Sequence, residues 1–191
     1  GAKACYEGDF CSFEQLKKHA VAKIKLLISD EAQDCYAMHK GGNENAPSFA
    51  DLDAIEKLGE LERLLRARAL KCYKEKYCSS AQLLELIRRN DRKYLHLTSD
   101  DALKLYAMNK GGNEHAPSFE GLASVDDEGV RSILLCYAKP IAEGYCSFGE
   151  IRFFDRSKLN DLGCERAMRL YKLRADGNEN APSFADFAGV A

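Results

Sequence analysis

Three segments of the chain nearly coincide, and this internal repeat constrains the fold more than any other feature. They run from Tyr36 to Leu52, from Tyr106 to Leu122 and from Tyr171 to Phe187. Each contains Gly-Asn-Glu and then Ala-Pro-Ser-Phe. Self-similarity at a regular spacing indicates stacked copies of one supersecondary unit. The sequence therefore predicts an array of similar units.

A second, weaker repeat lies upstream of each of these segments. It begins with Cys-Tyr and contains Cys-Ser, and its copies are Cys5–Leu16, Cys72–Leu83 and Cys136–Ile151. One copy of each repeat makes a full unit of 58–67 residues. We predict three tandem units, which span residues 3–69, 70–133 and 134–191.

Serines mark the expected helix starts in both repeats. Ser12-Phe-Glu-Gln and Ser48-Phe-Ala-Asp fit a capping box, in which the serine oxygen accepts a backbone N–H and the residue three later reaches back. Ser79 and Ser118 are expected to lack that partner. The apolar residues that follow are spaced by three or four, which predicts helices over 13–27 and 52–65.

Two further helices are expected to begin at Ser29 and Ser99, each followed by acidic residues that favour the positive end of the helix dipole. Both should stop at a Gly-Gly pair, because glycine adopts the positive φ of a helix C-cap without strain. The predicted fold is all-α, with three tandem units of paired helix-loop-helix repeats and disulfide staples.

The layout resembles a degenerate EF-hand. The aromatic Tyr36 stands 16 positions before Leu52, as the aromatic of the entering helix stands before the residue that follows a calcium loop, and Asp51 takes the place of the last carboxylate ligand. The resemblance implies three pairs of helix-loop-helix units. A solenoid of helical hairpins, each about 34 residues long, is an alternative.

The calcium ligands of that family are largely missing. A calcium loop needs oxygen ligands at its positions 1, 3, 5, 7, 9 and 12. The first position is Lys40, Lys110 or Ala175 in the three copies. We therefore expect no metal and no cofactor, and keep a calcium-binding protein with atypical loops as an alternative.

Paired cysteines recur once in each predicted unit. The pairs are Cys5/Cys11, Cys72/Cys78 and Cys136/Cys146, and the third encloses a four-residue insertion. Such a recurring framework favours disulfides and hence an oxidising compartment, so we expect a secreted or extracellular protein. The alternative is six buried thiols.

No catalytic set can be assembled from the histidines. His39 is replaced by Asn109 and Arg174 in the other copies, and a general base would not alternate with asparagine in active units. We therefore expect a protein that is not an enzyme.

The repeated loop has two interpretations. A structural one assigns helix starts and core anchors to Pro47, Ser48, Phe49, Pro117, Ser118, Phe119, Pro182, Ser183 and Phe184. A functional one makes the loop a contact surface, carried by Asn43, Glu44, Asn113, Glu114, Asn178 and Glu179.

Charge is unevenly distributed along the 191 residues, whose net charge is only −2. Residues 63–93 contain ten basic and three acidic side chains. This basic band comprises Arg63, Arg66, Arg68, Arg88, Arg89, Arg92 and Lys93, among others. It could attract an anionic partner or be a solvated surface.

The expected function is that of a non-catalytic binding or structural module whose partner is another protein. Single-stranded nucleic acid is not favoured, since the band lacks interleaved stacking aromatics. A membrane span is not expected either, because the sequence has no run of 18 apolar residues.

Overall fold

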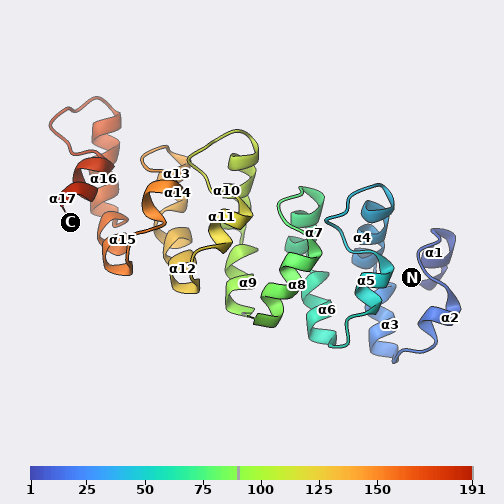
Figure 1. Cartoon of the computed structure of the whole chain (residues 1–191). Coiled ribbons are helices and arrows are strands. Elements are labelled where there is room, and N and C mark those ends of the chain that lie inside the picture. The colour runs from blue at the N-terminus through green and yellow to red at the C-terminus, as the bar shows by residue number, and fades with distance from the viewer. Residues whose placement is uncertain (90, 191) are drawn as a thin grey trace. The chain divides into compact units, whose positions relative to one another are not determined.

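The computed structural model describes residues 1–89 and 91–190. Over these residues the chain forms 17 helices and no strand, which confirms the predicted all-α class (Figure 1). The chain divides into two compact units, Gly1–Tyr94 and Leu95–Ala191, and each is described by itself. The three predicted unit boundaries remain predictions.

The first unit contains eight helices, and a ninth, α9 (Asp91–Leu97), extends across its end. The eight are α1 (Ala2–Glu7), α2 (Phe13–Leu16), α3 (Val21–Leu27), α4 (Asp30–Lys40), α5 (Phe49–Asp53), α6 (Leu58–Leu64), α7 (Ala67–Lys74) and α8 (Ser80–Arg89).

The second unit contains the remaining eight helices. They are α10 (Asp100–Lys110), α11 (Phe119–Ala123), α12 (Asp127–Cys136), α13 (Ala138–Ala142), α14 (Phe148–Ile151), α15 (Arg156–Leu162), α16 (Glu165–Ala175) and α17 (Phe184–Val190).

The two long helices predicted over 13–27 and 52–65 are each broken in two, so this part of the prediction is wrong. Residues 17–20 separate α2 from α3, and residues 54–57 separate α5 from α6. Ile55 N–H turns back to the Leu52 carbonyl at 3.2 Å, an i−3 bond that closes the helix. Apolar spacing of three or four therefore does not distinguish one long helix from two short helices joined by a bend.

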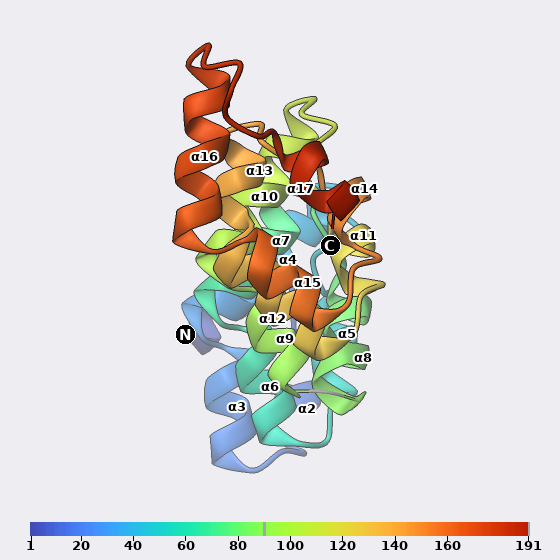
Figure 2. The same ribbon diagram turned by 90° about the vertical axis from the view of Figure 1, so that its left-hand side faces the viewer.

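Equivalent helices of neighbouring repeats pack against one another. In the first unit α3 packs on α6 and α4 on α7, and in the second α10 packs on α13 and α12 on α15. Within the second unit, α10, α13 and α16 follow one another on one side, and α11, α14 and α17 on the other (Figure 2). In this unit α12 and α15 pack in the same way, so equivalent helices of successive repeats lie side by side.

A buried tyrosine closes the helical hairpin in four repeats. Its hydroxyl donates to the carbonyl oxygen nine residues earlier, at the end of the preceding helix. The four bonds are Tyr36 to Leu27 at 2.9 Å, Tyr73 to Leu64 at 3.2 Å, Tyr106 to Leu97 at 3.0 Å and Tyr171 to Leu162 at 3.1 Å. The bond satisfies a carbonyl that the helix end leaves without an intrahelical partner.

Six helices end on a residue with positive φ. For two of them, the Gly-Gly pair in the sequence predicted this. These residues are Asp9, Gly42, Lys76, Gly112, Gly144 and Gly177. At Gly42 the following N–H, of Asn43, reaches the Met38 carbonyl at 3.0 Å, which is the Schellman pattern. The same type of bond recurs at the other five positions.

The serine caps are confirmed with one correction. Ser48 and Asp51 form a closed capping box, as Ser12 does with Gln15. The expectation that Ser79 lacks a partner is wrong, since its N–H donates to Gln82 Oε1 at 2.8 Å. Ser118 accepts the Gly121 N–H at 3.1 Å with no side chain to return the bond.

Candidate interaction site

The Gly-Asn-Glu loop is shaped by its asparagine. Asn43 Oδ1 accepts the Asn45 N–H at 3.2 Å, and the Asn43 carbonyl accepts the Ala46 N–H at 3.1 Å. The same two bonds form at the second and third loops, from Asn113 and Asn178. Each of these asparagines, predicted as a contact residue, is thus engaged in the turn of its own loop.

The residue at the His39 position closes the loop from the helix side. His39 Nδ1 lies 2.8 Å from the Ala46 carbonyl oxygen, and Asn109 Nδ2 donates to the Ala116 carbonyl at the same distance. Arg174 donates to the Glu179 carbonyl of the third loop. Histidine, asparagine and arginine can all place an N–H donor here, which explains why they interchange.

Each of the first two loops also reaches the next repeat. Asn43 Nδ2 donates to the Tyr73 carbonyl at 2.8 Å, and the Asn45 carbonyl accepts the Ser80 N–H at 2.9 Å. In the second unit the His115 carbonyl accepts the Phe148 N–H at 2.8 Å. Ser80 and Phe148 open their helices, so the loop satisfies an orphan N–H of the neighbouring repeat.

The Pro-Ser-Phe residues anchor the loop in the core. Phe49, Phe119 and Phe184 are buried. Each ring meets the edge or face of its repeat's tyrosine, with centroids 5.7 Å apart for Tyr36–Phe49, 5.8 Å for Tyr106–Phe119 and 5.7 Å for Tyr171–Phe184. Pro47 and Pro117 are buried and Pro182 is half-buried.

The glutamate is exposed in all three loops. Glu44, Glu114 and Glu179 are all exposed, whereas the asparagine before each of the first two is half-buried. The framework therefore uses every repeated loop residue except this acid, and the contact-surface prediction now rests on the three glutamates.

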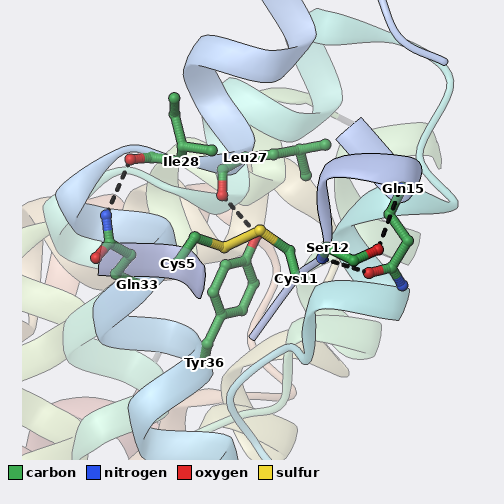
Figure 3. The surroundings of a disulfide bond; sticks show 8 residues. All are labelled: Cys5, Cys11, Ser12, Gln15, Leu27, Ile28, Gln33 and Tyr36. Carbon is green, nitrogen blue, oxygen red and sulfur yellow. Dashed lines mark hydrogen bonds between the residues drawn. A yellow bond between two sulfur atoms is a disulfide. The ribbon is translucent and has the colours of Figure 1, made fainter. Parts of the chain in front are cut away.

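One of the three predicted disulfides is present. Cys5 is joined to Cys11, with Cα atoms 5.7 Å apart, beside the Tyr36–Leu27 hydrogen bond (Figure 3). It is the single disulfide among the described residues. The structure supports the prediction for this pair, and it stays a prediction for Cys72/Cys78.

The third cysteine pair differs because of its insertion. The Tyr145 N–H donates to the Pro140 carbonyl, where the Phe10 N–H donates to Cys5 and the Tyr77 N–H to Cys72. Pro140 thus takes the structural place of the first cysteine. Cys136 lies four residues earlier as the last residue of α12, whereas Pro140 lies in α13. Its predicted bond to Cys146 would have to cross the break between these two helices.

Part of the basic band is engaged within the first unit. Arg88 Nε binds the buried Glu60 carboxylate at 2.9 Å, Arg89 pairs with Glu85 at 2.8 Å, and Arg63 donates to the Gly59 carbonyl. Burial raises the pKa of Glu60, but the hydrogen bond from Arg88 has the opposite effect, and the pKa is lowered overall.

Three further arginines of the band are at the surface. Arg66, Arg68 and Arg92 are exposed. Lys93 stands in the same register of the repeat as Lys23 and Lys158, which donate to backbone carbonyls at the end of their own repeat's short helix. An anionic partner for the band stays a prediction.

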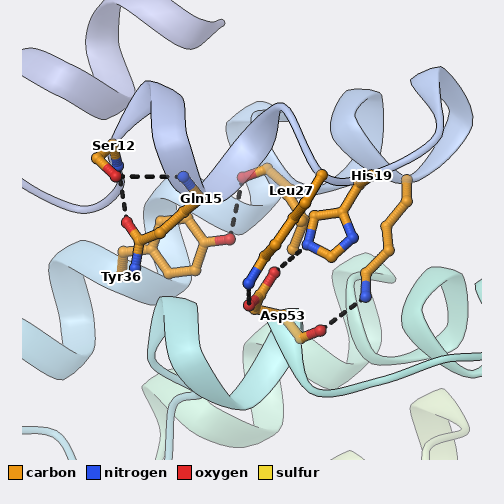
Figure 4. A network of polar contacts seen from close by, with 8 residues as sticks. Ser12, Gln15, His19, Leu27, Tyr36 and Asp53 are labelled. Atoms are coloured by element: carbon orange, nitrogen blue, oxygen red, sulfur yellow. Dashed lines mark hydrogen bonds and ion pairs between the residues drawn. The ribbon is translucent and has the colours of Figure 1, made fainter.

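A polar cluster that the sequence did not suggest surrounds Asp53 (Figure 4). Its carboxylate accepts from Lys18 Nζ at 3.0 Å and contacts His19 Nε2, and its backbone carbonyl accepts from Lys23 Nζ at 2.6 Å. Burial raises the pKa of Asp53, but the hydrogen bonds with Lys18 and His19 outweigh it and lower the pKa overall. The cluster ties α3 and the bend before it to α5.

The loop acids that would complete a calcium site serve as helix caps. Asp51 Oδ2 accepts both the N–H and the hydroxyl of Ser48, at 2.8 and 2.7 Å, and Asp186 does the same for Ser183. In the described part of the chain no three His, Cys, Asp or Glu side chains are grouped as metal ligands would be. The EF-hand resemblance remains a prediction.

The chain matches no known family model, no curated protein and no solved structure. Over the described residues, no helix has the length and apolar character that crossing a membrane requires.

Proposed function

We propose that this chain is a non-catalytic helical repeat protein of three tandem units that acts as a secreted binding or structural module. The observation that carries the proposal is the tyrosine hydroxyl bond, made four times with the same nine-residue separation. A chain that repeats one hairpin in this way presents equivalent side chains at regular intervals, as repeat proteins do when they bind a partner along an extended surface.

The glutamates of the three loops are the proposed contact residues. Glu44, Glu114 and Glu179 occupy the same loop position and are exposed. The other repeated residues of the same loops have structural roles: asparagine forms the turn, serine caps the helix, and proline and phenylalanine pack in the core. A purely architectural role of the loop does not explain why an acid occupies this position.

The test is a triple substitution of these glutamates by glutamine, compared with wild type in chemical crosslinking and affinity capture from the native extracellular fraction. The variant should melt at the wild-type temperature and lose the captured protein. A control that replaces the exposed Glu31, Glu56 and Glu62 removes the same charge and should retain it. Equal capture by all three proteins would contradict the proposal.

A further inference from the structure

In the second unit, the end of α12 lies against the start of α16 in the next repeat. α12 packs on α15, and Gly163, the C-cap of α15, directly precedes Cys164, the N-cap of α16. A Cβ atom on Gly163 would lie only 2.7 Å from the Cβ of Cys136, the last residue of α12. Glycine has no such atom, so the backbone at Gly163 comes directly against the Cys136 side chain.

This contact brings together two thiols that are far apart in sequence. A disulfide joins Cα atoms that lie about 4.4–6.8 Å apart. Cys164 is one trans peptide unit, about 3.8 Å between Cα atoms, from the backbone that touches Cys136. Burial raises the pKa of the Cys136 thiol, and the neighbouring Cys164 raises it further. Both the backbone contact and this electrostatic effect place Cys164 beside Cys136.

Cys164 stands at a helix cap where the other copies have serine. Ser29 and Ser99 cap α4 and α10, and each hydroxyl accepts the N–H three residues later, at 3.2 and 3.3 Å. Cys164 Sγ accepts the Ala167 N–H at 3.5 Å. Because a thiol is a weaker acceptor than a hydroxyl, capping does not account for the cysteine. Cys164 is exposed, so its sulfur is open to a dissolved oxidant.

The surroundings of Cys136 favour Cys164 over Cys146 as its partner. Cys136 is half-buried and lines a surface hollow together with Glu165 and Met168 of α16. Cys146 is 3% exposed, and burial raises its pKa to about 12, so little of it is present as the reactive thiolate. Of these two cysteines, Cys164 is therefore the accessible one.

We propose that Cys136 and Cys164 are a site of oxidation, at which a disulfide joins the end of α12 to the start of α16 in the next repeat. The oxidant is a small-molecule disulfide. The Cys164 thiolate attacks one of its sulfur atoms, the S–S bond breaks, and one half leaves as a thiol that takes up the proton lost by Cys164. Cys136 then gives up its proton and attacks the Cys164 sulfur, which forms the protein disulfide and releases the second half as a thiol. Two protein thiols are oxidised, and the small disulfide is reduced.

Peptide mapping of the full chain after mild oxidation tests the proposal. The reduced, folded protein is incubated with a series of ratios of oxidised to reduced glutathione, quenched in acid and digested without reductant. The Cys5–Cys11 disulfide is the internal standard. Where that bond is fully formed, a peptide cross-linked between Cys136 and Cys164 should be the main form of both residues.

Cys164→Ser is the matched variant, because serine caps the equivalent helices α4 and α10. When reduced, it should keep the wild-type circular dichroism. On oxidation it should leave Cys136 as a thiol or a glutathione adduct and gain less in melting temperature than wild type, since it lacks the bond between repeats. The proposal is overturned if Cys136 and Cys164 stay unlinked in wild type once Cys5–Cys11 is complete, if either joins Cys146 instead, or if oxidation raises the melting temperature of both proteins equally.

Discussion

The carbonyl oxygen of Asn45 accepts the Ser80 N–H at 2.9 Å, so the loop of one repeat caps the first turn of α8 in the next. The side chain of Asn43 adds a second bond across the same junction, 2.8 Å to the Tyr73 carbonyl. Repeats are therefore joined by polar bonds of the loop as well as by packing of equivalent helices.

The Asn43 bond gives the first prediction. Asn43→Ala should lower the free energy of unfolding by about 1 kcal/mol more than Asn178→Ala, because only the former removes a bond to the next repeat. Asn178 keeps the same turn bond to the residue two ahead and is the matched control. Urea unfolding of both variants measures the difference, and equal losses would show that the junction bond adds nothing.

The sequence predicts where helices start and stop better than where they bend. Ser29 and Gly42 act through properties of the residue itself, a hydroxyl that caps and a backbone that tolerates positive φ. The breaks after α2 and α5 have no such marker, since the apolar spacing runs across them. Tertiary packing of two short helices decides them.

The hydrogen bonds between a loop and the next repeat could not be predicted from the sequence, for a related reason. The acceptors at Asn45 and His115 are backbone carbonyls, which every residue type offers, so no residue pattern marks them. The Asp53 cluster was not predicted because Lys18 and His19, which bind its carboxylate, lie more than 30 positions away in sequence. The Cys136/Cys146 alignment followed sequence letters, whereas the insertion leaves Cys136 at the end of α12 and Pro140 in α13.

The lowered pKa of Asp53 predicts that the folded protein loses stability in acid. Its pKa is lowered in the folded protein, so its stabilising effect is present above the unfolded pKa of about 3.9 and is lost as the pH falls through the lower, folded value. Asp53→Asn should cost about 1 kcal/mol at neutral pH, and the difference from wild type should shrink below pH ~4. Thermal melts over this range measure it, and a pH-independent difference would contradict the assignment.

The cysteines should react with an alkylating agent in a fixed order. In the reduced, folded protein, exposed Cys164 should be modified first. Cys35 and Cys146 should resist, because both are buried and burial raises the pKa of each thiol to about 12. Peptide mass spectrometry after short alkylation gives the order, and early modification of Cys35 would contradict its packing.

Oxidation tests the remaining staple. The loop between Cys72 and Cys78 has the same length and the same Schellman bonds as the loop between Cys5 and Cys11. Under oxidising conditions we therefore expect Cys72 to pair with Cys78, and Cys136 not to pair with Cys146. Non-reducing peptide mapping identifies the bonds. A Cys136–Cys146 bond would show that the break between α12 and α13 does not separate that pair.

The central claim is that the repeated Pro-Ser-Phe loop is architectural, and Phe119→Ala tests it most directly. Phe119 is 3% exposed and packs on Tyr106, so its truncation should lower the free energy of unfolding by about 3–5 kcal/mol. Phe153→Ala, at a 76% exposed site, should change it by less than about 0.5 kcal/mol. Urea unfolding of the two variants beside wild type is the deciding measurement. A large loss confined to Phe119→Ala is the predicted result, and a Phe119→Ala protein as stable as Phe153→Ala would contradict the account.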